Sequence, residues 1–204
     1  MRFSREQLQA YRSARVPDLL PSPLRLLLVG INPSLTSAAA GAHFATRGNR
    51  FYPALAAAGI IGEAFDVSGG YPPEGLAQLR EAGIGVTNIV HEASARAAEL
   101  SPEQLRAGAA ELVTRIAGLH PRVVAVLGIT AYRVAFARPG AVTGEQPEVI
   151  GWDDGTGASR LFVLPNPSGL NAHETVASLA DAYAGAARAA GILPAPDGIS
   201  RSPR

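Results

Sequence analysis

Cysteine is absent from this chain of 204 residues. Its absence excludes disulfide bonds, thiolate nucleophiles, iron–sulfur clusters and cysteine-based zinc sites. The chain has only four histidines, and they are scattered without the spacing of metal ligands: His43, His91, His120 and His173. We therefore expect neither a metal nor another cofactor.

Lysine is absent as well, so all 18 basic residues are arginines. Without a lysine, no side-chain amine can form a Schiff base with a carbonyl group. The α-amino group of Met1 is the one amine that remains, and nothing in the sequence places it near the motifs described below.

Long hydrophobic runs are missing too. No stretch reaches the roughly 18 apolar residues that a membrane-spanning helix needs. The N-terminal region carries Arg2, Arg5, Glu6, Arg12 and Arg15 and lacks the apolar segment of a secretory signal. These features predict a cytoplasmic protein that is not bound to a membrane.

The formal net charge is only +1 at pH 7, which is not by itself the signature of a nucleic-acid-binding protein. The charges are unevenly distributed, however. Residues 1–50 contain seven arginines against two acidic residues, residues 51–120 four against eight, and residues 121–204 seven against seven. The positive excess in the first segment is either part of a binding surface or a locally basic surface without a partner.

Short apolar runs alternate with segments of helical spacing. Runs without polar alternation are typical of strands buried on both faces, and they occupy residues 25–30, 85–90, 122–128 and 160–164. Helices are predicted over residues 3–15, 49–58, 72–82, 101–119, 130–137 and 173–189. This alternation predicts one α/β domain over residues 1–190, with a parallel sheet covered by helices on both faces.

Two segments do not fit this alternation. Residues 139–157 are rich in turn residues, which predicts a loop or a small hairpin. Residues 191–204 are rich in proline, glycine and serine, which predicts a disordered tail.

The first predicted strand ends at Gly30, and Asn32-Pro33 follows it. Pro33 fixes its own backbone and pushes Asn32 toward extended geometry, so the chain leaves the sheet in a stiff loop. Open α/β sheets bind ligands beyond the carboxyl ends of their strands, and this places Asn32 at the expected site. The stretch up to residue 49 is interpreted as a loop of about twenty residues, a length that is more often functional than idle.

Three motifs carry a family resemblance. The first is Gly30-Ile31-Asn32-Pro33, followed by Phe44-Ala45 and Gly48-Asn49-Arg50-Phe51; the second is Leu164-Pro165-Asn166-Pro167-Ser168-Gly169-Leu170; a weaker third is Gly85-Val86-Thr87-Asn88-Ile89-Val90. In these motifs and their order, residues 24–187 resemble the mismatch-specific uracil/thymine DNA glycosylases, a branch of the uracil-DNA glycosylase superfamily.

The resemblance implies a three-layer α/β/α fold with a four-stranded parallel central sheet. It also implies a monofunctional DNA glycosylase of base excision repair that hydrolyses the N-glycosidic bond of uracil mispaired with guanine. Thymine and exocyclic cytosine adducts are further implied substrates. The partner would be double-stranded DNA with a flipped base, bound by a monomer in the bacterial nucleoid.

The resemblance further implies the roles of individual residues at the reacting base. Asn32 would orient the attacking water, because an amide hydrogen-bonds water but cannot accept its proton outright. Asn166 would support the departing base, and Phe44 would stack on it. The remaining implied substrate-binding residues are Ile31, Ser34, Ser37 and Asn88.

For the DNA around the flipped base, the resemblance implies contacts from the second motif. Leu170 would act as a wedge that fills the gap left in the duplex. The other implied DNA-binding residues are Ser168, Gly169, Asn171 and His173. The chain departs from some family members at two places, with Ser34 where they have glycine and Ala172 where they have arginine.

Glu92, after the second predicted strand, is a candidate second catalytic carboxylate, and a surface glutamate without a function is its alternative. Two other functions stay open: a non-catalytic protein that binds damaged or single-stranded DNA, and an unrelated small α/β hydrolase. The chain lacks a G-x-G-x-x-G after the first strand, a P-loop and G-x-S-x-G, which disfavours specific forms of the hydrolase. A binding protein would not need a water-orienting amide at Asn32.

Overall fold

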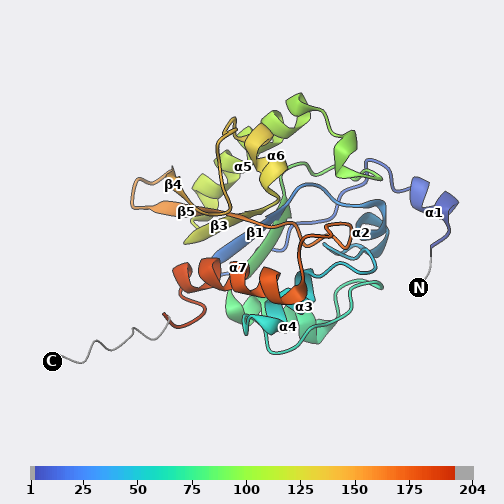
Figure 1. Cartoon of the computed structure of the whole chain (residues 1–204), viewed down its shortest axis with the longest axis horizontal. Coiled ribbons are helices and arrows are strands. Elements are labelled where there is room, and N and C mark those ends of the chain that lie inside the picture. Colours follow the sequence, from blue (N-terminus) through green and yellow to red (C-terminus); the bar gives the residue numbers. More distant parts are fainter. Residues whose placement is uncertain (1–2, 196–204) are drawn as a thin grey trace.

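A mixed sheet lies between two helical layers in the computed structural model, which describes residues 3–195 (Figure 1). The strands are β1 (Leu26–Gly30), β2 (Ile84–Asn88), β3 (Val123–Leu127), β4 (Gly144–Gly151) and β5 (Ala158–Leu164). Their order across the sheet is β2-β1-β3-β5-β4. The predicted α/β class with helices on both faces is confirmed.

Four of these strands are parallel, as predicted, but the sheet has a fifth strand, β4, which pairs antiparallel with β5 at the edge. The prediction of a four-stranded, wholly parallel sheet is therefore wrong. The extra strand comes from residues 139–157, where a hairpin was one of the two predictions. Pro147 conceals the strand in the sequence, and it is tolerated because it falls at the register shift of an edge strand.

The core explains why the strand sequences show no polar alternation. All residues of β1, β2 and β3 are buried, because both faces of the sheet are covered. On one face pack α3 (Phe51–Ala57), α4 (Pro73–Ala82) and α7 (Val176–Ala189); on the other pack α5 (Pro102–Leu119) and α6 (Ile129–Ala135). Figure 1 shows these two layers below and above the sheet.

The structure also corrects the stretch after β1, which was predicted to be one long loop. It contains a short helix, α2 (Leu35–Ala40). Ser34 is its N-cap and accepts a hydrogen bond from the Ser37 N–H, and Gly41 ends it with φ of 65°. The run of alanines concealed this helix, because it shows no amphipathic pattern.

Helix boundaries differ from the prediction at both ends of the chain. The first helix, α1, covers only Arg5–Gln9. In the middle of the chain, a short 3₁₀ turn, η1 (Ala97–Glu99), precedes α5. The last helix begins at Val176, and its N-cap is Thr175 instead of Asn171. By contrast, the predicted start of α5 at Ser101 is observed, with a complete capping box.

The predicted tail, residues 191–204, lies mostly outside the described residues. Of its first residues, Ile192 and Leu193 pack against the core. Within residues 3–195, no helix combines the length and the apolar character needed to cross a membrane.

Candidate active site

The carboxyl ends of the four parallel strands meet at one edge of the sheet. Gly30 at the end of β1 is in register with Asn88 at the end of β2, and Leu127 of β3 is in register with Leu164 of β5. The chain passes from β2 on one side of β1 to β3 on the other, so this edge holds the topological switch point. Open α/β sheets bind their ligands at such a point.

A cavity of about 710 Å³ opens at this edge. Its lining includes most of the residues that the sequence predicted for the site: Ile31, Asn32, Ser34, Ser37, Phe44, Asn88, Asn166, Ser168, Gly169 and Leu170. A second cavity of about 840 Å³ shares residues 44 and 46–49 with the first, but Asn32, Asn88 and Asn166 do not line it. The first cavity, which we call the asparagine cavity, is therefore the candidate active site.

Asn32 is held by its amide nitrogen. Nδ2 donates to the Ser94 hydroxyl at 2.8 Å, to the Glu92 carbonyl at 3.1 Å and to the Pro33 carbonyl at 3.3 Å. Because carbonyl oxygens can only accept, these contacts fix which end of the amide is the nitrogen. Oδ1 has no hydrogen-bond partner among residues 3–195 and can accept a hydrogen bond from water in the cavity.

Asn166 is held by its oxygen. Its Oδ1 accepts a hydrogen bond of 2.9 Å from the Ser168 N–H, and its Nδ2 has no partner among the described residues. A Cβ atom built on Gly128 would lie 3.3 Å from Ile31 Cδ1 and 3.7 Å from Asn166 Nδ2. Gly128 thus allows the loops after β1 and β5 to approach each other at one rim.

Asn88 is buried beneath the same cavity, and its Nδ2 has no hydrogen-bond partner within the described chain. A Cβ atom on Gly30 would lie 2.5 Å from Asn88 Oδ1 and 3.3 Å from Phe44 Cζ. Glycine at position 30 therefore keeps space between the Asn88 amide and the Phe44 ring. The buried Asn88 Nδ2 donor is costly in free energy unless a ligand accepts its hydrogen bond.

Phe44 lies on one wall of the cavity with its ring stacked on Phe51, at 4.0 Å between ring centroids and 22° between ring planes. Its φ is 58°, a left-handed conformation that costs a non-glycine residue about 1–2 kcal/mol. The buried Ser37 hydroxyl holds this segment by accepting from the Ala45 N–H at 3.1 Å, and Ser34 Oγ lies 2.8 Å from Thr46 Oγ1. Ser34 and Ser37 thus position Phe44 as well as lining the cavity.

Comparison with known proteins identifies the family. Residues 17–186 match the family model described as the Uracil DNA glycosylase superfamily. The chain belongs to this superfamily. Membership implies DNA glycosylase activity, and with it DNA as partner and DNA repair as process.

The fold agrees with a solved structure. The solution NMR structure of a candidate uracil DNA glycosylase from Methanosarcina acetivorans superimposes with a TM-score of 0.54 at 19% identity, covering 87% of this chain and 98% of that one. At this identity the likeness establishes a common fold and nothing finer.

His43 also lines the cavity, and the sequence did not predict its burial. His43 is buried, its Nδ1 lies 3.1 Å from the Tyr71 hydroxyl, and its Nε2 has no partner among residues 3–195. Burial lowers the pKa of His43 from 6.5 to about 4, so the ring is neutral at pH 7. Its position next to Phe44 was a signal, but its burial could not be read from a loop sequence.

Glu92 does not line the asparagine cavity, although its main-chain carbonyl holds Asn32. Its carboxylate is 42% exposed and pairs with Arg15. Burial alone would raise the pKa of the Glu92 carboxyl, but the hydrogen bond and charge of Arg15 lower it below its usual range. In this structure the Glu92 carboxylate therefore faces Arg15 and lies outside the cavity lining.

Leu170 is 92% exposed at the mouth of the cavity, so it is not a core residue. Asn171 and His173 follow it outside the cavity lining. The Asn171 side chain donates to the Asn166 carbonyl at 3.1 Å, and its Oδ1 accepts from the His173 N–H. Asn171 therefore shapes the loop, and His173 is exposed.

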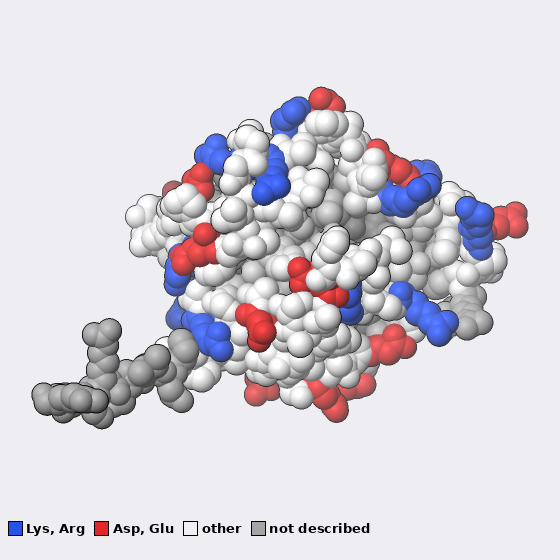
Figure 2. Space-filling model, in the orientation of Figure 1, with Lys and Arg blue, Asp and Glu red and all other residues white. Residues whose placement is uncertain are grey.

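Two arginines lie at the cavity, and one of them, Arg47, belongs to the N-terminal segment with the basic excess. Arg47 and Arg96 are exposed, line the cavity, and form no ion pair with a described residue. In contrast, Arg12 pairs with Glu99 and Arg15 with Glu92. Figure 2 shows positive and negative side chains dispersed over the face in view, without one continuous positive patch.

Proposed function

We propose that this protein is a monofunctional DNA glycosylase that hydrolyses the N-glycosidic bond of uracil mispaired with guanine, after the base has flipped out of the duplex. Thymine and exocyclic cytosine adducts are further candidate substrates. The observation that carries the proposal is the placement of Asn32, Asn88 and Asn166. They come from three strand ends, line one cavity, and each keeps an amide atom without a partner in the described chain.

The flipped base would occupy the cavity beside Phe44. Phe51 supports one face of the Phe44 ring, and stacking of a base on an aromatic ring contributes roughly 1–3 kcal/mol. The Asn88 amide and the main-chain N–H groups of Ile31 and Phe44 make no hydrogen bonds within residues 3–195, and they would read the base edge. Uracil suits them because its edge offers carbonyl oxygens beside an N–H.

Bond cleavage would then need little acid or base chemistry. The C1′–N1 bond breaks with its electron pair moving to the base, which leaves an oxocarbenium-like sugar and an anionic base. The free Nδ2 of Asn166 and the neutral ring of His43 would hydrogen-bond the base as its charge develops.

Asn32 would orient the attacking water. Its Oδ1 accepts a hydrogen bond from a water molecule and directs the water oxygen toward C1′, where the new C–O bond forms. The surplus proton leaves to solvent, since the sugar–base bond is largely broken before attack. The mechanism does not require Glu92.

The absence of lysine supports hydrolysis without strand cleavage. A lyase step needs an amine that forms a Schiff base with the abasic sugar. The chain has no lysine, and Met1 lies outside the described residues. The products would be the free base and an intact abasic strand.

The test is excision from a duplex with one G·U pair, followed by alkaline cleavage of abasic sites. Wild-type protein should give alkali-dependent scission, and borohydride should trap no covalent complex. Asn32→Ala should lose turnover on the order of 100-fold while still binding DNA. Folded wild-type protein that releases no base would contradict the proposal. If that protein still binds the duplex, the result would favour a non-catalytic DNA-binding protein.

The same assay addresses the finer substrate preference. Duplexes with uracil, thymine or an adducted cytosine, each opposite guanine and adenine, should show the fastest excision for uracil opposite guanine. Faster excision of any other base would correct the assigned substrate without affecting the assignment as a glycosylase.

A further inference from the structure

The loop that carries Leu170, residues 166–174, reaches away from the core. A leucine that is 92% exposed receives little support from its own packing. Hydrogen bonds within the loop give it a turn, such as the 2.9 Å bond from the Asn171 N–H to the Ser168 carbonyl. These local bonds define the shape of the loop but do not attach it to the rest of the protein.

Arg50 makes that attachment. Its guanidinium donates to the main-chain carbonyls of Ser168, Asn171 and Glu174, with 2.8 Å to Asn171. Its own main-chain N–H donates to the Pro167 carbonyl at 3.0 Å. The two terminal nitrogens of Arg50 are therefore bound to the main chain on both sides of Leu170.

Arg50 is itself well anchored. It is the N-cap residue of α3, the helix whose Phe51 is completely buried in the core. A guanidinium can hold several carbonyl oxygens at once because its donors form a planar fork, which a lysine ammonium lacks. Arg50 thus transfers the rigidity of the core to an otherwise exposed loop.

A close main-chain contact supports the same attachment. A Cβ atom on Gly169 would lie 2.7 Å from the Gly48 carbonyl oxygen, so the two segments touch through main-chain atoms. Gly48 has φ of 78°, a conformation suited to glycine. Residues 48–50 therefore hold the Leu170 loop by main-chain contact and by the Arg50 fork.

We propose that Arg50 is a positioning residue for Leu170, which it holds ready to enter the DNA stack. This inference rests on the proposed function. A loop that is ordered before binding does not lose conformational freedom when it inserts, and so inserts at a lower free-energy cost. Arg50 would act only where a wedge is needed, on paired DNA, because a single strand leaves no gap to fill.

The test is a double-mutant cycle with Arg50→Lys and Leu170→Ala, measured as single-turnover excision from a G·U duplex and from a single strand with one uracil. Arg50→Lys keeps the charge and removes the fork. It should slow duplex excision by about tenfold and single-strand excision by no more than about twofold. In the Leu170→Ala background, Arg50→Lys should add no more than about twofold.

Arg188→Lys is the matched control, since Arg188 is exposed on α7 and lies outside the cavity lining. Amide hydrogen exchange gives a readout that does not depend on activity: residues 168–174 should exchange faster in Arg50→Lys than in wild type. If Arg50→Lys does not fold, Gly169→Ala disturbs the neighbouring contact with Gly48, which supports the same attachment, and should give the same selective loss on duplex DNA.

The outcomes separate the two proposals. If wild-type protein excises uracil, three results would refute the role of Arg50 and leave the proposed function standing. They are an undiminished Arg50→Lys effect in the Leu170→Ala background, equal losses on duplex and single strand, and unchanged hydrogen exchange. No excision by folded wild-type protein from either substrate would refute the proposed function, and the role of Arg50 with it.

Discussion

The side chains of Asn32 and Ser94 are joined by a 2.8 Å hydrogen bond, with the Asn32 Nδ2 as donor. The Ser94 hydroxyl in turn donates to the Arg96 carbonyl at 2.8 Å. The amide is therefore oriented by the segment that follows β2, about sixty residues away along the chain. This contact leaves Asn32 Oδ1 without a hydrogen-bond partner among residues 3–195.

Removing this contact should slow catalysis without preventing substrate binding. Ser94→Ala deprives Asn32 of one of its anchors, a loss of about 1 kcal/mol, and should lower kcat by roughly five- to tenfold with KM nearly unchanged. Single-turnover and steady-state excision of uracil would measure this. The control is Thr114→Ala, which removes an exposed helix hydroxyl. An unchanged kcat would show that Ser94 does not orient Asn32.

Loss of the Phe44 ring should lower kcat/KM for excision, because the flipped base loses its stacking partner. Stacking of about 1–3 kcal/mol predicts that Phe44→Leu lowers kcat/KM by roughly 5- to 150-fold. Phe136→Leu is a matched control, because it removes a ring stacked on Tyr132 among residues that pack on the other face of the sheet. Similar losses in both variants, at similar thermal stability, would argue against a stacking role for Phe44.

Arg47 and Arg96 should account for part of the salt dependence of DNA binding. Each phosphate contact that is removed lowers the slope of log K against log salt concentration by about 0.9. Arg47→Gln and Arg96→Gln should each reduce the slope by that amount in a fluorescence anisotropy titration of duplex DNA. Arg188→Gln should leave the slope unchanged, and an unchanged slope in all three variants would exclude both arginines from phosphate contacts.

His120 should make stability depend on pH. Its Nε2 lies 2.8 Å from an Asp153 carboxylate oxygen, and this hydrogen bond, together with the charges of Asp154 and Asp153, raises its pKa above 6.5. Because the pKa is higher in the folded state, the protonated ring stabilises the protein fully below about pH 6.5. That contribution is lost as pH rises through the folded-state pKa.

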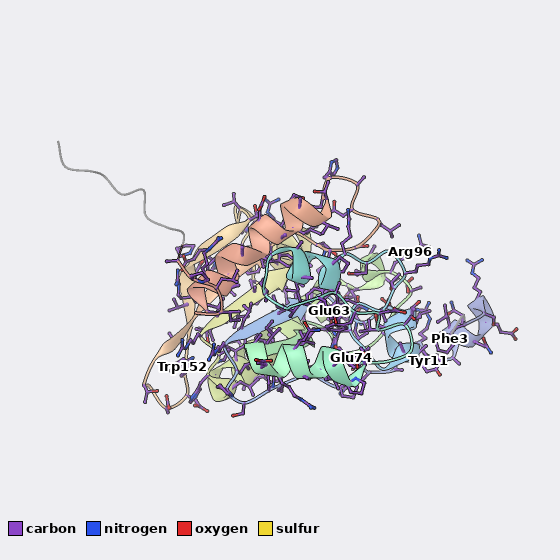
Figure 3. All side chains as sticks on the ribbon, turned by 90° about the horizontal axis from the view of Figure 1, so that it is seen from below. Phe3, Tyr11, Glu63, Glu74, Arg96 and Trp152 are labelled. Atoms are coloured by element: carbon purple, nitrogen blue, oxygen red, sulfur yellow. The ribbon has the colours of Figure 1, made fainter. Side chains whose placement is uncertain are left out.

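The measurement is the urea midpoint of wild type minus that of His120→Asn, from about pH 5.5 to about pH 9. Asparagine is chosen because His120 has φ of 51°, which asparagine tolerates. The difference should be largest at low pH and shrink as pH rises, and Asp153→Asn should reduce it, since Asp154 still raises the pKa of His120. Excision activity should not change, since Figure 3 shows Trp152, on which His120 stacks, at the opposite end of the molecule from Arg96. A difference independent of pH would contradict the role of His120.

The fold class could be predicted because strands buried on both faces are apolar, whichever helices cover them. The runs at 25–30, 85–90, 122–128 and 160–164 each became a strand. The fifth strand and α2 could not be predicted in this way. Pro147 in β4 and the alanines of α2 do not show the apolar pattern that predicts a strand or a helix. These two elements depend on packing against their neighbours.

The sequence by itself determined that neutral amides would stand at the carboxyl ends of the sheet, with no lysine or cysteine available for covalent chemistry. Only the tertiary structure decided which atom of Asn32 is free, that His43 is buried and neutral, that Glu92 faces Arg15, and that Arg50 holds the Leu170 loop. The reason is physical. Strand burial and loop stiffness follow from neighbouring residues, whereas the orientation of an amide, the desolvation of a histidine and the partners of a guanidinium depend on groups that the fold brings together from distant parts of the chain.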